Sequence, residues 1–391
     1  MRYRWLFALV AAGLASQAFP NKRIMGWGST RGGESSLQFS ANYSATRTMI
    51  SLNFPGATIS STDTIAPTAL QNVDIIWLGV TTSFNSAITP LSASEKTALL
   101  RFIQEGGTAV LFADNSTFSA GAVAANNSLM NPLGLVITGT LNGTVAHTFV
   151  SPGTSPFTGP FGGVVSLNSG FPGWFAFVPP TGEVLSTAGP GGNALFATIP
   201  PDGLGEGSGR CWLFADSGQA GTGGVQGANW NTLFANMIEA STARVAGQVT
   251  LADCVAMTMP RSLSLKVMQG STTVATSTVI STAVTDYFSI GIPMGVTGAA
   301  ELIIDASPHL RRRVPITLAG GGLNTGVIVI ENGDVDDSGE VDAADIDAVI
   351  ADFGDIWPNG DGNSSADADN SGEVDAADID LVISAFGSVD E

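Results

Sequence analysis

Two acidic segments near the C-terminus repeat one spacing of oxygen-bearing side chains. The segment that begins at residue 333 reads GDVDDSGEVDAADIDAVIADFG, and its pattern returns 33 residues later as ADADNSGEVDAADIDLVISAFG. In each copy, oxygen-bearing side chains occupy positions 1, 3, 5, 9 and 12 of a loop that has glycine at position 6. Calcium takes about six to eight oxygen ligands, and glycine tolerates the sharp turn that wraps the chain around the ion. The spacing therefore predicts two calcium sites.

The candidate ligands follow from these loop positions. The first loop offers Asp334, Asp336, Ser338, Glu340, Asp342 and Asp345, and the second offers Asp367, Asp369, Ser371, Glu373, Asp375 and Asp378. The residue at position 7, a glutamate in both loops, contributes its backbone carbonyl in this pattern, and position 9 commonly acts through a water. Two Ca2+ ions are thus the expected cofactors.

A short helix is predicted after each loop, because apolar residues recur there at i, i+3, i+4 and i+7. The two stripes consist of Ile346, Val349, Ile350 and Phe353, and of Ile379, Val382, Ile383 and Phe386. Gly354 and Gly387 would end the helices. Matched stripes can bury against each other, but so small a core depends on a cation to hold its carboxylates together.

With these loops and stripes, residues 333–388 resemble a type I dockerin domain. The resemblance implies two calcium-bound helices packed antiparallel, with residues 355–366 as the connecting segment. It also implies a cohesin-like or other cell-surface protein as the partner. Two features depart from the family pattern: position 5 is serine in both loops, and positions 10 and 11 are alanine pairs where cohesin-selecting polar residues are common.

Composition separates this tail from the rest of the chain. The net charge of the 391 residues is −19, and residues 331–391 hold 19 acidic residues without a lysine or arginine. The remaining chain has 15 acidic and 15 basic residues, so the negative charge is local. This balance argues against nucleic acid as a partner.

The first 18 residues have the pattern of a signal peptide: a short basic segment, an apolar run and the small residues Ser16-Gln17-Ala18. We therefore expect a secreted or cell-surface protein with no transmembrane span after signal cleavage. Only Cys211 and Cys254 could form a disulfide, and the sequence leaves open whether they do.

Residues 244–330 predict a β-sandwich of about seven short strands. They resemble the prealbumin-like (carboxypeptidase-regulatory-like) sandwiches that precede dockerins, most clearly in the stretch SPHLRRRVPITLAG. Its arginines, 311–313, could dock the acidic tail or an acidic polysaccharide, but a solvated strand edge is the favoured interpretation. His309 is interpreted as a turn residue.

Residues 20–243 predict an α/β domain. Strands are expected at 23–27, 72–80, 108–113 and 210–215, with helices at 91–107 and 229–240 and a β-rich insertion over roughly 131–205. Ser92 and Glu95 form a capping box at the first of these helices. The alternation implies a parallel sheet and resembles the class I glutamine amidotransferase-like (flavodoxin-like) superfamily.

The α/β region lacks the cysteine nucleophile of an amidotransferase. The turn after residues 108–113 reads Asp114-Asn115-Ser116, Cys211 lies inside a predicted strand, and His147 has no acidic partner nearby in sequence. Asp114 and Asp216 each follow a predicted strand and could form the acid–base pair of a glycosidase. We favour the interpretation that each caps the next helix. Three tryptophans, Trp174, Trp212 and Trp230, could stack on sugar rings, or pack in the core.

Together these patterns predict a multidomain, secreted, calcium-binding protein: a flavodoxin-like α/β domain with a β insertion, a β-sandwich and a small all-α tail. The tail would attach the protein to a protein partner. The α/β domain would bind a ligand, such as a polysaccharide, without catalysis. The alternative is a polysaccharide-degrading O-glycosyl hydrolase recruited through the tail. The sequence leaves open whether the protein is an enzyme.

Overall fold

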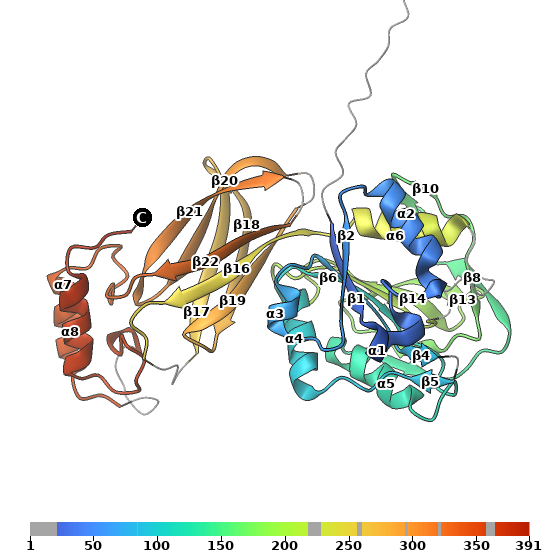
Figure 1. Ribbon diagram of the computed structural model, residues 1–391, viewed down its shortest axis with the longest axis horizontal. Coiled ribbons are helices and arrows are strands. Elements are labelled where there is room, and N and C mark those ends of the chain that lie inside the picture. The colour runs from blue at the N-terminus through green and yellow to red at the C-terminus, as the bar shows by residue number, and fades with distance from the viewer. Residues whose placement is uncertain are drawn as a thin grey trace, which may run out of the picture.

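The computed structural model describes residues 22–83, 85–217, 228–255, 260–293, 296–319, 322–356 and 364–390. The predicted signal peptide and the middle of the segment that connects the two C-terminal helices lie outside these ranges. Figure 1 shows three parts in a row: an α/β part, a pair of packed β-sheets and, at the far end, two helices side by side. No helix in the described ranges is long and apolar enough to cross a membrane.

Five parallel strands form the centre of the α/β part, in the order β2-β1-β3-β6-β15. They are β1 (Arg23–Trp27), β2 (Thr58–Thr62), β3 (Ile75–Gly79), β6 (Thr108–Phe112) and β15 (Cys211–Phe214). The first four predicted strands thus have their counterparts here. If these five strands are numbered 1 to 5 along the chain, their order in the sheet is 2-1-3-4-5. This is a doubly wound order, in which a ligand crevice forms at the carboxyl ends of the strands.

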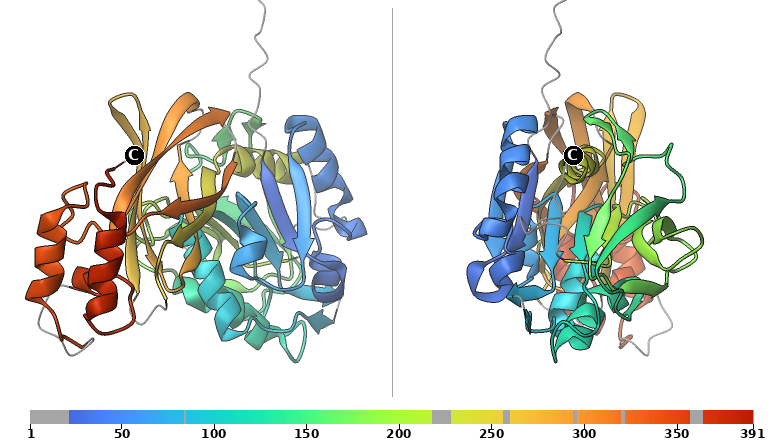
Figure 2. Two further views of the ribbon diagram at one scale, coloured as in Figure 1. Left: turned by 60° about the vertical axis from the view of Figure 1, so that its left-hand side comes forward. Right: turned by 90° about the vertical axis from the view of Figure 1, so that its right-hand side faces the viewer.

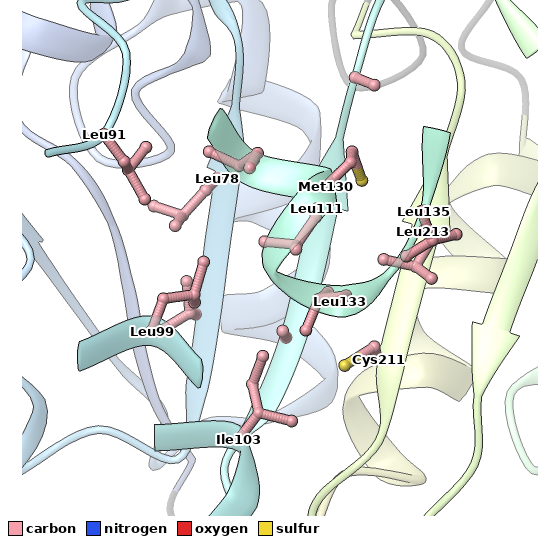
Figure 3. Close-up of a cluster of buried hydrophobic side chains, with 14 of the residues drawn as sticks. Leu78, Leu91, Leu99, Ile103, Leu111, Met130, Leu133, Leu135, Cys211 and Leu213 are labelled. Atoms are coloured by element: carbon pink, nitrogen blue, oxygen red, sulfur yellow. The ribbon is translucent and has the colours of Figure 1, made fainter. Parts of the chain in front are cut away.

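Helices cover both faces of this sheet because its strands are apolar on both sides. On one face, α4 (Ala93–Gln104) and α5 (Ala122–Met130) pack against Leu78 and Leu111. On the other face, α2 (Ser44–Asn53) and α6 (Ala228–Glu239) enclose an aromatic core around Trp77. Figure 3 shows part of the first core, including the buried thiol of Cys211. The predicted capping box at Ser92 and Glu95 is present at the start of α4.

The predicted insertion extends the sheet with antiparallel strands beyond β15. The order continues as β14 (Ala194–Ile199), β13 (Glu183–Ala188), β8 (Thr144–Phe149) and β11 (Asn168–Gly170), with β12 (Trp174–Phe177) and β7 (Val136–Thr138) to the side. Shorter elements complete this part: α1 (Ser29–Gly32), η1 (Gly33–Ser35), η2 (Ala41–Tyr43), α3 (Pro67–Leu70), β4 (Thr81–Ser83), β5 (Ser86–Ala87), η3 (Asn131–Leu133), β9 (Thr158–Gly159) and β10 (Gly162–Gly163).

Seven strands form the middle part as two sheets around one apolar core. The three-stranded sheet is β19-β16-β22 and the four-stranded sheet is β18-β17-β20-β21. Their bounds are β16 (Ala243–Leu251), β17 (Arg261–Gln269), β18 (Thr272–Ser281), β19 (Thr285–Ile292), β20 (Thr297–Ala306), β21 (His309–Ala319) and β22 (Leu323–Ile330). Burial alternates along β17, as expected for strands with one face on a core.

Buried and partly buried charged groups join the α/β part to the sandwich. Arg244 of β16 is 3% exposed and donates hydrogen bonds to the carbonyls of Leu70 and Val73, at 3.1 and 2.7 Å. Arg101 of α4 pairs with Asp286 of β19 at 3.1 Å. Because breaking buried pairs is costly, these contacts hold the two parts in one arrangement.

The C-terminal part consists of α7 (Ala343–Ala351), η5 (Ser364–Ala366) and α8 (Ala376–Ala385). Figure 2 shows α7 and α8 side by side beyond the sandwich. Val349 and Val382 are fully buried between them, and Leu310 of β21 joins the same core. The predicted stripes are only half buried, however, since Ile350, Phe353, Ile383 and Phe386 are more than half exposed.

Candidate functional site

Each acidic loop ends where a helix begins, and the helix start positions two of its carboxylates. Asp342 is the N-cap of α7 and accepts a hydrogen bond from the backbone N–H of Ala344 at 2.7 Å. Asp345 stands three residues later and accepts from the N–H of Asp342 at 2.8 Å. This capping box fixes loop positions 9 and 12.

The same Asp345 side chain points back across the first loop. Its second oxygen accepts from the N–H of Val335 at 2.6 Å and of Asp336 at 3.1 Å. Asp334 accepts from the N–H groups of Ser338 and Gly339, at 2.8 and 3.0 Å. The chain can make this tight circle because Gly339 has a φ of +91°.

The second loop repeats this geometry. Asp367 accepts from the N–H groups of Ser371 and Gly372, at 3.0 and 3.1 Å. Asp378 accepts from those of Asp369 and Asp375, at 3.1 and 2.8 Å. Equal spacing in the sequence has therefore produced equal loops, as expected when the ligands lie within a dozen residues of one another.

Three carboxylates converge in each loop. The oxygens of Asp334, Asp336 and Asp345 lie within 4.8 Å of one another, and so do those of Asp367, Asp369 and Asp378. Burial, together with the neighbouring carboxylates, raises the pKa of Asp334 and of Asp367 to about 6. Such a set of carboxylate oxygens fits a hard divalent cation, which prefers oxygen ligands.

The remaining predicted ligands lie around these triads. Ser338 and Ser371 donate to the carbonyls of Glu340 and Glu373, at 3.1 and 3.3 Å, so loop positions 5 and 7 touch. Both glutamate side chains are exposed, in keeping with a role for the backbone carbonyl alone. Asp342 and Asp375 each use one carboxylate oxygen as a helix cap.

The second loop is attached directly to the sandwich. Arg261 of β17, which is 5% exposed, donates to the carbonyl of Asp367 at 2.6 Å. Asn332 donates to the carbonyl of Ala368 at 2.7 Å, and the N–H of Val255 donates to the carbonyl of Asp369 at 3.0 Å. The end of the sandwich therefore holds the backbone of loop positions 1 to 3.

Arg311 and His309 lie at the start of β21. Arg311 is on the edge strand of its sheet, and its guanidinium pairs with Asp390 at 3.2 Å while its backbone N–H donates to the same carboxylate at 2.8 Å. For this arginine the alternative, docking of the acidic tail, describes the contacts better than a solvated strand edge. His309 pairs with Ala306 across the turn between β20 and β21, but it is 1% exposed, and burial lowers its pKa to about 4.

A second site lies at the carboxyl edge of the parallel sheet, where a cleft of about 450 Å3 opens. Asp114 follows β6 and Asp216 follows β15, and because these strands are neighbours both carboxylates line this cleft. Burial raises the pKa of Asp114 to about 6. Its carboxylate accepts hydrogen bonds from the N–H and the amide of Asn115, at 2.7 and 3.0 Å, and from the hydroxyl of Ser217.

The favoured capping role is wrong for Asp114. The helix that follows it, α5, has Gly121 as its N-cap and no side-chain cap. Asp216 is 1% exposed and accepts from the N–H of Gly170 at 2.9 Å. The residues between Ser217 and α6 lie outside the described ranges, so its capping role stays a prediction.

The other candidates in the α/β part have structural positions. Cys211 is buried inside β15 and burial raises its pKa to about 12; it and Cys254 are both free. His147 contacts the hydroxyls of Ser186 and Ser169 at 2.7 and 2.6 Å, and burial lowers its pKa to about 4. Trp212 and Trp230 belong to the aromatic core, as the alternative to sugar stacking predicted.

The sequence analysis missed most of the cleft walls. Glu34 and Asn42 come from the segment after β1, Asn85 follows β3, and Phe171 comes from the insertion. A search for polar residues directly after each predicted parallel strand could have found Thr81 of the lining, but not Glu34, Asn42 and Asn85, which lie further along the chain. No local pattern marks Phe171, because only the folded insertion brings it to the sheet edge.

The chain matches no protein-family model and no curated protein sequence. Among solved structures, it is similar to an N-terminal interface mutant of the type II cohesin–X-dockerin complex from Acetivibrio cellulolyticus. The identity is 15% and the TM-score is 0.30, and the match covers 38% of this chain and 97% of that chain. It is also similar to the N-terminal domain of mmIFT52 (11% identity, TM-score 0.41, 55% of this chain and 94% of that one). A third is the exo-β-1,4-mannosidase from Opitutaceae bacterium strain TAV5 (11% identity, TM-score 0.30, 51% and 31%). These similarities assign no function to this chain.

Proposed function

We propose that residues 333–388 bind two calcium ions and that the calcium-bound tail attaches this modular protein to a protein partner outside the cell. The observation that carries the calcium assignment is the convergence of three carboxylates in each loop. Oxygen ligands of this kind are what calcium prefers. Asp334, Asp336 and Asp345 would hold one ion, and Asp367, Asp369 and Asp378 the other.

Calcium would supply the positive charge that the two triads lack. Without it, carboxylates at this distance repel one another, and the core between α7 and α8 is small. The loop backbones already wrap the carboxylates through N–H donors. Calcium binding and folding of the tail are therefore expected to be coupled.

The attachment surface follows from the exposed apolar side chains of the tail. Six of them are more than half exposed and form pairs 33 residues apart: Ile350 with Ile383, Phe353 with Phe386, and Ile356 with Val389. We refer to these six residues as the apolar tail surface. Exposed apolar side chains that lie together are typical of protein-binding surfaces, and β-bridges place Ile356 beside Glu373 of the second loop and Val389 beside Glu340 of the first. The partner is therefore expected to be a protein that presents apolar side chains of its own.

The contacts between the tail and the sandwich give this attachment a mechanical consequence. Arg261, Asn332 and Arg311 bond the tail to one end of the sandwich, and Arg244 and Arg101 bond its other strands to the α/β part. The three parts follow one another in a row (Figure 1). A partner at the tail would hold the α/β part at a distance set by the sandwich.

The alternative, a glycan hydrolase, has less support from the geometry. Its acid–base pair would be Asp114 and Asp216, which do line one cleft. Both oxygens of Asp114, however, already accept hydrogen bonds from Asn115 and Ser217. A general acid or base needs an oxygen that can reach the substrate.

Equilibrium dialysis and partner capture with the full-length protein test the proposal. We expect two calcium ions per chain, and tail helices that unfold in a chelator while the rest stays folded. A secretome partner captured in calcium should be lost in the Phe353→Ser/Phe386→Ser variant, with calcium stoichiometry unchanged. Val327→Ser, an equally exposed apolar site on the sandwich, is the matched control. No retained calcium at millimolar supply would overturn the calcium assignment, and capture that survives the double substitution would overturn the attachment surface.

A further inference from the structure

The cleft at the sheet edge has the position and size of a ligand site. Segments after four of the parallel strands, β1, β3, β6 and β15, contribute to its walls. This is the edge at which doubly wound sheets bind ligands. Its volume of about 450 Å3 falls within the range of roughly 300–1,000 Å3 of small-molecule sites.

The side chains of the cleft indicate the charge of the ligand. The described lining residues include no lysine, arginine or histidine, and three of them are carboxylates: Glu34, Asp114 and Asp216. An anionic ligand, such as a phosphate or a sugar acid, would therefore meet like charge without a cation to pair with. The ligand is neutral or positively charged.

Amides and hydroxyls outnumber the carboxylates and favour a neutral, polyhydroxylated ligand. The amides of Asn42, Asn85 and Asn142 line the cleft, and the hydroxyl groups include those of Thr81, Thr117, Thr140 and Ser217, whereas the amide of Asn115 is used within the floor. An amide both donates and accepts hydrogen bonds. A sugar hydroxyl also does both, whereas an ammonium group only donates. The mixed lining therefore matches a sugar better than an amine.

Phe171 supplies an apolar surface beside these polar groups. Its side chain is 57% exposed, and its φ of 55° lies in the left-handed region that phenylalanine rarely adopts. The backbone is held there by two hydrogen bonds: its N–H donates to Gly143 at 2.9 Å, and its carbonyl accepts from the amide of Asn115 at 3.0 Å. Strained residues of this kind concentrate at ligand sites.

The floor of the cleft is rigid before any ligand binds. The side-chain oxygen of Asn115 accepts from the N–H and hydroxyl of Thr117, both at 3.0 Å, and Asp114 accepts from Ser217 across the two strand ends. Asp216 accepts from Gly170, next to Phe171. A site that is ordered in advance loses little entropy on binding.

We propose that this cleft binds a neutral sugar unit of a glycan, with Phe171 against the C–H face of the ring and the asparagine amides on its hydroxyls. The floor residues lie on three separate segments, and none belongs to the calcium loops. Sugar binding is consequently independent of the proposed role of the tail.

Calorimetry of the full-length protein with cellohexaose, mannohexaose and xylohexaose tests the proposal. Oligogalacturonate and a glucosamine hexamer serve as the anionic and cationic counter-probes. We expect saturable binding of at least one neutral oligosaccharide, equally in calcium and in chelator, and no binding of the anionic probe. This independence of calcium separates the result from a failure of the calcium assignment.

Substitution of Phe171 provides the decisive comparison. Phe171→Asn removes the ring but keeps a residue that tolerates the left-handed conformation, and it should weaken sugar binding by about tenfold or more. Asn142→Ala on the exposed rim is the second variant, and Phe177→Asn, exposed on β12 outside the lining, is the matched control. The proposal is overturned if no neutral probe binds, if the cationic probe binds tightest, or if both cleft variants keep the affinity of the control.

Discussion

Replacement of Asp378 by asparagine should have opposite effects on the tail with and without calcium. Asp378 is fully buried at the start of α8, and burial raises the pKa of its carboxyl. Its oxygens lie within 4.8 Å of those of Asp367 and Asp369. Asparagine has the same shape but no charge, so the substitution removes one calcium ligand charge and two of the three close carboxylate pairs.

The size of both effects can be estimated from this geometry. Two unit charges 4.8 Å apart repel by about 3 kcal/mol at an effective dielectric constant of about 20. The variant avoids two such repulsions but keeps only one of the two backbone hydrogen bonds that the Asp378 oxygens accept, a loss of about 1.5–3 kcal/mol. Its calcium-free tail should therefore be no less stable than that of the parent. In calcium it loses one bound ion, which at a free concentration about a hundredfold above Kd contributes about 2.7 kcal/mol.

Titration calorimetry and thermal unfolding of the tail measure the two effects. Asp378→Asn should reduce the calcium stoichiometry from two to one and lower the unfolding midpoint of the tail in calcium. In chelator, where the tail of the parent is expected to unfold, the helix content of the variant measured by circular dichroism should be no lower than that of the parent. Asp380→Asn makes the same charge change two residues further along α8, on its exposed side, and is the matched control. The reasoning is refuted if the variant keeps two equivalent sites, or if its helix content in chelator falls below that of the parent.

Two further predictions concern buried charged groups elsewhere. Arg261→Met should lower the stability of the calcium-bound tail by about 2 kcal/mol, the order of a hydrogen bond to a charged group. The control Arg313→Met breaks only an exposed pair with Glu301 and should cost at most about 0.5 kcal/mol. Equal losses of stability in chemical denaturation would contradict the role of Arg261 in holding the tail on the sandwich. Asp114 has a pKa raised to about 6 by burial, so the folded state binds its proton more tightly than the unfolded chain, and stability is lost as the pH rises from about 4 to 6. Asp114→Asn removes this loss. The difference between the unfolding midpoints of the variant and the parent should therefore be more favourable to the variant at pH 7 than at pH 4. A difference that does not change with pH would contradict the argument that burial raises the pKa of Asp114.

The sequence predicted the convergence of the acidic side chains and the helix starts well, because their contacts are local. Asp342 and Asp345 are three residues apart, and the capping box that they form depends on that spacing alone. The same holds for Ser92 and Glu95 at α4. The central strands were predicted equally well, because a continuous apolar run such as that of β3 indicates a strand with both faces buried in the sheet.

Predictions that depended on distant partners were less successful. Periodicity identified Ile350 and Phe353 as one side of a helix with Val349, but only Val349 is buried: Ile350 is exposed, and Phe353 lies beyond the end of α7 at Ala351. The strand pattern around Arg311 indicated exposure, and the tail that pairs with it begins some 20 residues later. Local patterns state which side chains are apolar or charged, and not what packs on them.

The sequence by itself determined the two acidic loops, because the candidate ligands of each loop lie within twelve consecutive residues whose course the loop glycine and the helix cap dictate. Only the tertiary structure decided that Asp114 and Asp216, about a hundred residues apart, line one cleft with Phe171. That juxtaposition requires β6 and β15 to pair in parallel across a long insertion. Such pairing is set by the burial of both sheet faces at once, which is a property of the whole fold.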